Sequence, residues 1–300
     1  ISIDDNEVVN LKLLCDDIFI ENNFIALLPT IMNLKGNQDE FGFAGTHEYT
    51  LVYAKNKFKA KFSEFNIDDE EMDDWVEDDL GMYKKGANLK STGTNAPREK
   101  RPNLYYPIFV TPKNKVYVTN NDKRINPEDK AVYPKTDRKE MSWRWEKKKV
   151  RNEIYNLIIV ADDTEVSIYK KQRPKLGDIP SKKPKTIFYK PEYSSGNGTA
   201  QLKEFFGGKV INNPKPLVLI KDLLFISSKK GSVILDFFAG SGTTAQAILE
   251  LNKEDGGSRK FILVQLPEKC DEESEAYKAK YKTIADISKE RIRRAIKKIE

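Results

Sequence analysis

One short stretch near the C-terminal end has the residue types and spacing that a small charged ligand requires. It runs from Asp236 to Thr244 and reads DFFAGSGTT, after the apolar run Val233–Leu235 and before the apolar-periodic segment TTAQAILELN. This order predicts a strand, a tight turn and a helix. Gly240 and Gly242 carry no Cβ, so the backbone of the turn can come close to a ligand.

The ligand that suits this turn carries both a negative and a positive group. Free backbone amides at a helix start favour a carboxylate or a phosphate. The acid Asp236 at the strand end suits a cationic amine. An amino acid satisfies both requirements, and S-adenosylmethionine contains one, so we predict S-adenosylmethionine as the cofactor. Plain helix capping by Thr243 and Thr244 is compatible with this role. For Phe238, packing in the core is an equally good interpretation.

A dinucleotide-binding turn is the strongest competing interpretation. Gly240, Gly242 and Ala245 fit the loose pattern G-x-G-x-x-G/A. However, Asp236–Ala239 separate the first glycine from the strand. The next predicted strand ends at Gln265 and lacks the acid that binds a ribose in dinucleotide folds. The acid before the turn and the small residues after it favour S-adenosylmethionine.

The segments around the turn predict a βαβ unit. SVILDFF and RKFILVQL read as buried strands, and TTAQAILELN between them reads as a helix. A helix over TAQLKEFFG is expected to be capped by Thr199 and to end at Gly207. Another over KPLVLIKDLLFISS has Pro216 in its first turn. The tail YKTIADISKERIRRAIKKIE predicts a long basic amphipathic helix.

The rest of the chain divides into two regions that differ in composition and in hydrophobic pattern. At the N-terminal end, ISIDD, NFIALLPTIM and HEYTLVYAKN are strand candidates, and NEVVNLKLLCDDIF has the spacing of an amphipathic helix. The middle is polar and aromatic, and its patterned segments are short. Hairpins are predicted to turn at Pro112–Asn114 and at Asp162–Asp163. QRPKLGDIPSKKPK is expected to be irregular. We therefore predict three parts: residues 1–59, an insert at 60–195, and residues 196–300.

Composition excludes several classes of protein. No apolar run approaches the length of about 18 residues that a membrane span needs. Two distant cysteines, Cys15 and Cys270, and the single histidine, His47, provide no zinc-ligand spacing. We expect a cytoplasmic protein without a metal, with both cysteines buried and inert and with His47 as an ordinary surface or capping residue.

Charge is unevenly distributed along the chain. The segment from Glu64 to Asp79 carries ten acids and no base, and that from Lys170 to Lys190 carries eight bases and one acid. A basic surface with interleaved aromatic residues suggests a polyanionic partner, although solvated faces are the simpler interpretation. Trp143 and Trp145 suit such a surface, but we favour a core position for at least one of them. The candidate contacts with such a partner are Arg98, Arg101, Tyr105, Arg144, Lys147, Lys148, Lys149, Arg151, Lys170, Lys171 and Arg173.

Several separated segments, in order, resemble one known family. LDFFAGSGTT is similar to the cofactor motif of amino-methylating DNA methyltransferases of the beta class. ISIDDNEVVNLKLLCDDIF, HEYTLVYAKN, RPNLYYPI, NPKPLVLIKDLL and LNKEDGGSRKFILVQLPE together resemble the modification subunits of type III restriction–modification systems. The resemblance covers both ends of the chain and touches the middle.

The resemblance implies a fold, a site and partners. The fold is α/β: a Rossmann-like, mostly parallel sheet with helices on both faces and an inserted α+β target-recognition domain. Residues 1–59 would belong to the catalytic half, 60–195 would be the recognition insert, and 196–300 the cofactor half. Double-stranded DNA, a restriction (helicase–nuclease) subunit and a second copy of the chain would be the partners. The implied cofactor contacts are Asp236, Phe238, Ala239, Gly240, Ser241, Gly242, Thr243, Thr244, Lys215, Pro216 and Gln265.

The chain departs from the family pattern at one point. The family places a polar or acidic residue, Pro-Pro and an aromatic residue at the reacting amine, and this sequence contains no Pro-Pro dipeptide. We therefore expect an internal fragment, with the tetrapeptide upstream of Ile1, and no methyl transfer by these residues alone. Turnover by the isolated chain would contradict that expectation. The resemblance favours methylation of adenine N6. Methylation of cytosine N4 or of RNA, and a non-catalytic DNA-binding or assembly fragment, are the alternatives.

Overall fold

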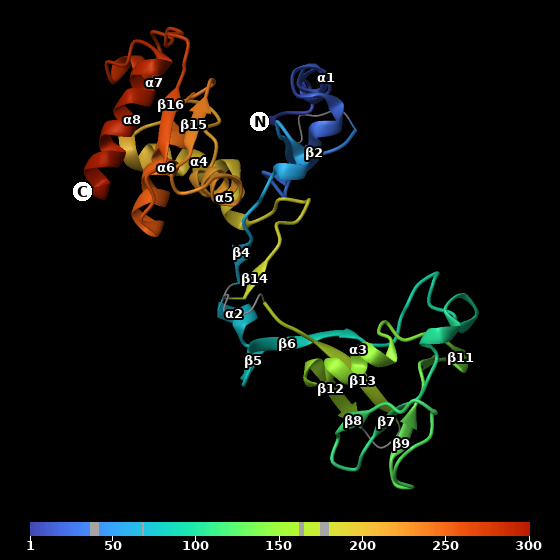
Figure 1. Ribbon diagram of the computed structural model, residues 1–300. Coiled ribbons are helices and arrows are strands. Elements are labelled where there is room, and N and C mark those ends of the chain that lie inside the picture. The colour runs from blue at the N-terminus through green and yellow to red at the C-terminus, as the bar shows by residue number, and fades with distance from the viewer. Residues whose placement is uncertain (37–41, 68, 162–164, 175–179) are drawn as a thin grey trace. The chain divides into compact units, whose positions relative to one another are not determined.

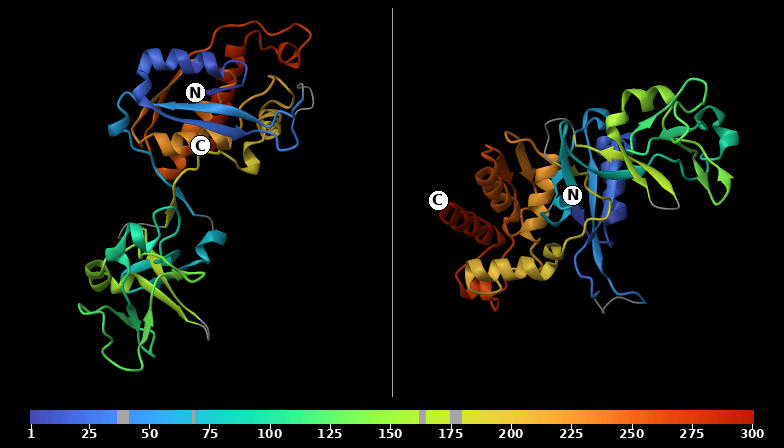
Figure 2. Two further views of the ribbon diagram at one scale, coloured as in Figure 1. Left: turned by 90° about the vertical axis from the view of Figure 1, so that its right-hand side faces the viewer. Right: turned by 90° about the horizontal axis from the view of Figure 1, so that it is seen from below.

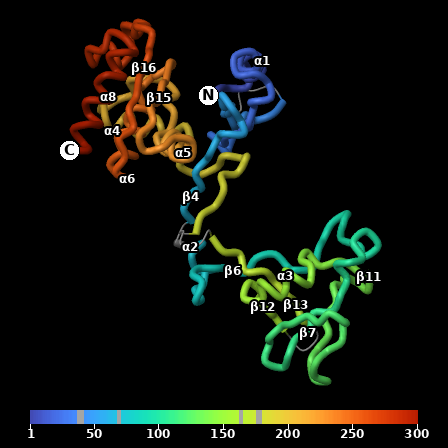
Figure 3. Tube along the Cα trace, viewed as in Figure 1, coloured from blue at the N-terminus to red at the C-terminus, as the bar shows by residue number. Residues whose placement is uncertain are grey.

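A computed structural model describes residues 1–36, 42–67, 69–161, 165–174 and 180–300, and these form two compact units. Unit 1 comprises Ile1–Phe65 and Lys183–Glu300, and unit 2 comprises Asn66–Lys182. The chain passes from one unit to the other twice, at the short strands β4 (Phe65–Asn66) and β14 (Ser181–Lys182) (Figure 3).

The boundaries of unit 1 extend beyond those expected from composition, because residues 60–65 and 183–195 pack with it. The ring of Phe65 stacks on that of Phe225, with centroids 6.1 Å apart. Phe188 is buried, and its backbone exchanges hydrogen bonds of 2.9 Å with Pro29 and Ile31. Aromatic burial, which polar composition does not reveal, therefore places residues 60–65 and 183–195 in unit 1.

The N-terminal segment of unit 1 forms an antiparallel sheet and a helix. Strands β1 (Ser2–Ile3), β2 (Phe24–Ile31) and β3 (His47–Tyr53) lie in the order β1-β3-β2. Helix α1 (Val8–Phe19) lies alongside them (Figure 2). These strands and this helix confirm the sequence prediction. The apolar side chains of α1 are largely exposed, however, and only Cys15 is buried.

The C-terminal segment of unit 1 contains the predicted βαβ unit. Strands β15 (Val233–Asp236) and β16 (Lys260–Leu263) pair in parallel, and α6 (Thr243–Asp255) connects them. Figure 1 shows both strands with α6 and α8 beside them. The helices of this segment are α4 (Ser195–Phe206), α5 (Leu217–Ser227), α6, the short α7 (Glu275–Lys278) and α8 (Ile284–Ile299). Helix α8 begins with a capping box between Thr283 and Asp286.

Two predicted helix starts need correction. Helix α4 begins at Ser195 with Ser194 as its N-cap, so Thr199 lies inside the helix. The earlier start is possible because Gly198 lets the helix contact the chain at Pro214, where an added Cβ would lie 2.2 Å from the Pro214 carbonyl oxygen. Pro216 is the N-cap of α5 rather than a residue of its first turn. The end of α4 at Gly207, with φ of 76°, is confirmed.

The expectation that β15 and β16 are buried is wrong for one face. Val233, Leu235 and Ile262 are 62%, 57% and 55% exposed, and the alternate residues are half-buried. A parallel strand is buried on both faces only when other elements cover both. The described residues cover one face of this two-stranded sheet.

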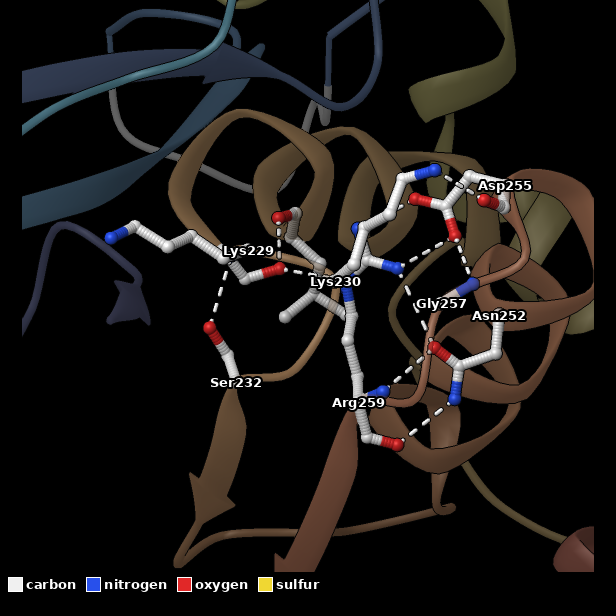
Figure 4. Close-up of polar contacts among 9 residues, drawn as sticks. Lys229, Lys230, Ser232, Asn252, Asp255, Gly257 and Arg259 are labelled. Carbon is white, nitrogen blue, oxygen red and sulfur yellow. Dashed lines mark hydrogen bonds and ion pairs between the residues drawn. The ribbon is translucent and has the colours of Figure 1, made fainter.

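A buried polar cluster joins the start of β16 to the end of α6 (Figure 4). The Arg259 side chain is almost fully buried and donates to the two carboxylate oxygens of Asp255 at 3.1 and 2.8 Å. Asn252 pairs with the backbone N–H and C=O of Arg259 at 3.0 and 2.9 Å. The guanidinium lowers the pKa of the Asp255 carboxyl. The cluster therefore stabilises the end of the βαβ unit that lies away from the glycine-rich turn.

Arg259→Met is expected to lower the free energy of unfolding by about 1–3 kcal/mol, as measured by urea denaturation. The cost arises because Asp255 loses its partner, and partial solvation of that carboxylate limits the loss. Arg293 is the control, since it is 69% exposed and 3.5 Å from Glu290. Arg293→Met should change stability by less than about 0.5 kcal/mol. Equal effects of the two substitutions would contradict the structural role of Arg259.

Unit 2 is built from small antiparallel sheets. Strands β5 (Trp75–Asp78), β6 (Gly81–Asn88), β12 (Leu157–Ala161) and β13 (Val166–Gln172) form one sheet in the order β12-β13-β6-β5. A second sheet has the order β8-β7-β9, with β7 (Ile108–Val110), β8 (Val116–Tyr117) and β9 (Lys130–Val132). The remaining elements are the hairpin of β10 (Lys135–Thr136) with β11 (Lys139–Glu140), and the helices α2 (Asp69–Met72) and α3 (Lys147–Asn152).

Both predicted hairpins of unit 2 are present. Strand β7 pairs with β8 and β12 pairs with β13, each antiparallel. In the first turn, Asn114 adopts φ of 58°, a left-handed conformation that asparagine tolerates. The second predicted turn, Asp162–Asp163, lies outside the described residues, as does much of QRPKLGDIPSKKPK. The core of unit 2 gathers around Trp143, Tyr106 and Val150.

Candidate functional site

The glycine-rich turn between β15 and α6 has a backbone that requires its glycines. Gly240 and Gly242 adopt φ of 51° and 77°, and Gly242 is the N-cap residue of α6. The Gly242 N–H donates to the Ala239 carbonyl at 2.8 Å, which closes the turn. Side chains with a Cβ disfavour these left-handed conformations.

Asp236 organises this turn from the end of β15. One carboxylate oxygen accepts from the Thr244 hydroxyl at 2.6 Å, and the other accepts from the Phe238 N–H at 3.1 Å. The acid therefore connects the strand end to the first turn of α6. Both oxygens are engaged within the turn, and a ligand amine would have to share them.

Gln265, after β16, contacts the same turn. Its side-chain oxygen accepts from the Gly240 N–H at 2.7 Å, and its side-chain nitrogen donates to the Leu266 carbonyl at 3.3 Å. The side chain thus occupies a backbone amide that a ligand would otherwise use. It is close enough to the turn to contact a ligand there.

The segment before α5 connects the turn to β3. The Lys215 ammonium forms an ion pair with Glu48 of β3, and the Lys215 carbonyl accepts from the Thr243 hydroxyl at 3.4 Å. Pro216 follows as the N-cap of α5. Lys215 therefore already has a carboxylate partner, and its backbone rather than its charge contacts the turn.

A cavity of about 420 Å³ opens over the turn. Of the predicted cofactor residues, Asp236, Phe238, Ala239, Gly240, Ser241, Thr243, Thr244 and Lys215 line it. Gly242, Pro216 and Gln265 lie next to lining residues rather than in the lining itself. Asn212 and Asn213 also line the cavity and were missed, although the Asn-Asn-Pro order before a helix is a recognisable turn signal.

A larger cavity of about 630 Å³ lies elsewhere in unit 1, between apolar side chains that include Leu28, Phe62 and Phe188. Its lining includes Glu64, Lys183 and Lys185 but neither a glycine-rich turn nor a helix start. We therefore place the candidate site at the smaller cavity, whose volume lies in the range of small-molecule sites.

Phe238 is exposed, which excludes the core interpretation for this residue. Its exposed fraction is 78%, and its ring centroid lies 5.1 Å from that of Phe237. Phe237, which the sequence did not single out, is 50% exposed. Both rings lie at the rim of the cavity, where an aromatic face can stack on a planar ligand group.

Arg291 of α8 is the clearest residue that sequence reasoning missed. Its guanidinium is buried beneath the turn and donates to the Ser241 hydroxyl at 2.9 Å and to the Thr243 hydroxyl at 2.7 Å. Burial lowers the pKa of Arg291 to about 10, and Glu250 partly offsets that effect. The basic pattern of α8 predicts an exposed cation, so only the fold reveals this contact.

In unit 2, six of the predicted DNA-contacting residues already pair with acids. Arg98 and Tyr105 both contact Glu140, at 2.7 and 2.6 Å. Lys171 and Arg173 share Asp78, each at 2.5 Å. The other two pairs are Lys147 with Asp122 at 2.6 Å and Lys149 with Glu153 at 3.5 Å. Phosphate contact by these six residues would require competition with an internal carboxylate.

The other five predicted contacts have no carboxylate partner within the described parts of the chain. Arg144 donates to the Asn88 carbonyl at 3.1 Å and to the Thr92 hydroxyl at 3.3 Å. Arg101 contacts the Ser91 hydroxyl at 3.5 Å, and Arg151 contacts the Asn120 side chain. Neutral partners leave the positive charge available to a phosphate. This set, the uncompensated cations, is Arg101, Arg144, Lys148, Arg151 and Lys170.

The acidic and basic runs of the sequence meet in unit 2. Asp78 accepts from Arg173 and Lys171, and Glu71 pairs with Lys182 at 2.7 Å. Hydrogen bonds from Arg173 and then Lys171 hold the pKa of Asp78 well below its usual value. Part of the basic run therefore compensates the acidic run internally.

Asp78→Asn is expected to destabilise unit 2 by about 1–2 kcal/mol at neutral pH, because two cations lose their charged acceptor. The lowered pKa means that the stabilisation is present above the unfolded-state value near 3.8 and is lost as pH falls through the lower folded-state value. Unfolding measured from about pH 7 to pH 2 should therefore depend less on acid in Asp78→Asn than in wild type. Parallel acid profiles would refute the pairing.

The aromatic residues near these bases are largely core residues. Trp143 is 2% exposed and donates to the Tyr106 carbonyl at 2.8 Å, and Tyr106 is also 2% exposed. Trp145 is partly buried and packs against the same cluster. The preference for a core position of at least one tryptophan is confirmed.

A family model described as DNA methylase, for N6 and N4 methyltransferases, matches residues 1–297. The chain belongs to this DNA methylase family. The match spans the βαβ unit, the glycine-rich turn and unit 2, so the methyltransferase fold applies to both ends of the chain.

Similar members of the DNA methylase family include type III modification subunits. The chain is 50% identical to the EcoPI Mod subunit of Escherichia phage P1, over 99% of this chain and 46% of that protein. It is 33% identical to the type II methyltransferase M.KpnI of Klebsiella pneumoniae, over 97% of this chain and 67% of that protein. The EcoP15I Mod subunit of Escherichia coli is 32% identical, over 99% and 47%. The chain spans about half the length of these Mod subunits.

These similarities confirm the resemblance to type III modification subunits that the sequence segments indicated. Cys15 and Cys270 are free and buried, and burial raises the pKa of each thiol. His47 contacts the Tyr49 hydroxyl at 3.1 Å. Among the described residues, no cluster of metal-ligating side chains is present, and no helix has the length and apolar character for a bilayer span.

Proposed function

We propose that the protein is an S-adenosylmethionine-dependent DNA methyltransferase, the modification subunit of a type III restriction–modification system. The observation that carries this proposal is the glycine-rich turn over its cavity, within a chain that belongs to the DNA methylase family. The target we propose is the N6 amine of an adenine in double-stranded DNA. The base would leave the helix to react, because that amine is inaccessible inside a duplex.

The residues at the turn fit S-adenosylmethionine, which supplies the methyl group when bound. Two left-handed glycines lead into the start of α6, and the free amides of a helix start suit the carboxylate of the cofactor. Asp236 offers an acceptor for its amine, and the exposed Phe238 offers a face for its adenine. Gln265 would exchange the Gly240 amide for a ribose or adenine contact. These residues bind and orient the cofactor so that its methyl group meets the base in line.

Unit 2 is the proposed target-recognition domain. The uncompensated cations would meet phosphates and set the affinity for DNA, and arginines among them can also read guanine in the major groove. Lys147, Lys149, Lys171, Arg173, Arg98 and Tyr105 would act mainly within unit 2, since carboxylates already bind them. A restriction subunit and a second copy of the chain are proposed as partners from the likeness to Mod subunits.

The reaction product tests this proposal. The full-length protein is incubated with DNA and S-adenosylmethionine carrying a deuterated methyl group, and the DNA is digested to nucleosides for mass spectrometry. We expect labelled N6-methyldeoxyadenosine. Labelled N4-methyldeoxycytidine would change the target base but keep the activity, which matters because the family includes both chemistries. Cofactor binding without any labelled nucleoside would overturn the proposed function.

A further inference from the structure

We propose that Arg291 is a positioning residue that makes the glycine-rich turn selective for a ligand with a carboxylate. The inference rests on the proposed function, because the ligand in question is the amino acid end of the cofactor. Arg291 would act from behind the turn, through Ser241 and Thr243, without touching the ligand itself.

The contacts of Arg291 converge on the turn. One guanidinium nitrogen, Nη1, donates to both the Ser241 and Thr243 hydroxyls, and Nε donates to the Gln246 side-chain oxygen at 2.8 Å. All three acceptors lie in the turn or in the first turn of α6, although Arg291 is 45 to 50 residues away in the chain. The guanidinium therefore holds Ser241 and Thr243, which line the cavity.

The charge of Arg291 is buried against neutral acceptors. Arg291 is 1% exposed, and Ser241, Thr243 and Gln246 are each 5% exposed or less. Gln246 in turn donates to Glu250 at 2.9 Å, so that carboxylate is one residue removed from the guanidinium. In the described parts of the chain, no carboxylate pairs directly with Arg291. A buried charge without a direct counter-ion is costly, and an anion bound at the turn reduces that cost.

The close packing of α8 against the glycine-rich turn fixes the position of the Arg291 charge relative to that turn. An added Cβ at Gly242 would lie 2.8 Å from the Ser288 hydroxyl oxygen and 3.2 Å from the Ser288 carbonyl oxygen. Ser288 precedes Arg291 by three residues, so both lie on the same face of α8. The turn therefore rests directly on the helix that carries the arginine.

The hydroxyls transmit the charge towards the cavity. Because Ser241 and Thr243 accept from Arg291, their own hydrogens are left to donate elsewhere. Thr243 reaches the Lys215 carbonyl at 3.4 Å, and Ser241 lies 3.1 Å from Thr243. Both residues line the cavity, so the Ser241 hydroxyl can donate to a ligand oxygen there. Charge-assisted hydrogen bonds of this kind favour an anionic acceptor over a neutral one.

A purely structural role for Arg291 predicts equal weakening of every ligand, whereas the proposed role affects only a ligand with a carboxylate. Two ligands that differ in the carboxylate therefore distinguish the two roles. S-adenosylhomocysteine and its decarboxylated analogue keep the nucleoside, sulfur and amine, and differ only in the carboxylate. Their dissociation constants are measured by calorimetry with the full chain. We expect wild type to prefer S-adenosylhomocysteine by about 100-fold, and Arg291→Met to reduce that preference to about threefold, roughly 2 kcal/mol of selectivity.

Arg291→Lys separates charge from shape and is the safer variant for folding. It keeps the positive charge but lacks the separate Nε and Nη1 donors to Gln246 and to the two hydroxyls, so the carboxylate preference should persist at about 30-fold or more. Loss of the carboxylate preference in Arg291→Lys, in spite of the retained charge, would overturn the inference, as would an unchanged preference in a folded Arg291→Met. Arg259→Met is the matched control, since it removes a buried arginine far from the turn and should leave the preference intact.

The same measurements separate this inference from the proposed function. If wild-type protein binds neither ligand, both the proposed cofactor site and the role of Arg291 are wrong. Wild-type protein that binds both ligands equally would keep the cofactor site and refute the role of Arg291 alone.

Discussion

Gly242→Val is expected to weaken S-adenosylhomocysteine binding at least about 100-fold while unit 2 keeps its structure. Gly242 has φ of 77°, which a β-branched residue adopts only with strain. A Cβ there also meets Ser288 of α8 at 2.8 and 3.2 Å, and the second contact is to a backbone oxygen that cannot rotate away. Strain of about 3 kcal/mol, expressed as displacement of the turn, corresponds to about 100-fold in affinity.

The controls for Gly242→Val are Gly231→Ala, and Gly242→Ala with and without Ser288→Ala. Gly231→Ala adds a methyl group just before β15, where nothing lies within 4 Å, so its affinity should match wild type. Gly242→Ala should weaken binding less than valine, and Ser288→Ala in the same chain should recover part of the loss because it removes the nearer contact. Calorimetry measures the affinity, and amide hydrogen exchange in unit 1 reports whether that unit remains folded. Normal binding by a folded Gly242→Val would rule out the turn as the cofactor site.

Removal of four uncompensated cations from unit 2 should have the second large effect. In Arg101→Gln, Arg144→Gln, Lys148→Gln and Arg151→Gln combined, DNA affinity at about 0.1 M salt is expected to fall by about 100-fold or more. Each lost phosphate contact should also reduce the slope of log affinity against log salt by about 0.9, so the slope should fall by about 3.6 in total. Fluorescence anisotropy with a labelled duplex, repeated over a salt series, measures both quantities.

The matched control uses cations that already have a carboxylate. Lys171→Gln with Arg173→Gln removes two charges paired with Asp78, so it should reduce the stability of unit 2 more than the salt slope. A slope change of less than about 0.5 is expected for this pair of substitutions. If the control lowers the slope as much per charge as the four-residue variant does, the distinction between paired and uncompensated cations is wrong.

Local sequence was sufficient for the elements around the turn. The apolar run in SVILD, the glycines of AGSG and the helical spacing of TTAQAILEL depend on neighbouring residues, and they predicted β15, a tight turn and α6. The hairpins of unit 2 were predictable for the same reason. The cofactor proposal also began in this stretch, because a glycine, an acid and a helix start recognise charge through groups that are close in sequence.

Tertiary structure alone decided which charges are available and which faces are covered. Arg291 reaches Ser241 across 50 residues and Arg173 reaches Asp78 across 95, and no local pattern indicates either pairing. The exposure of Phe238 and Leu235 depends on which elements lie over them. Charge compensation and burial are properties of neighbours in space. Arg291, in a helix whose sequence is basic, is therefore a buried cation beneath the turn. Part of the basic run likewise pairs with the acidic run, as Arg173 does with Asp78.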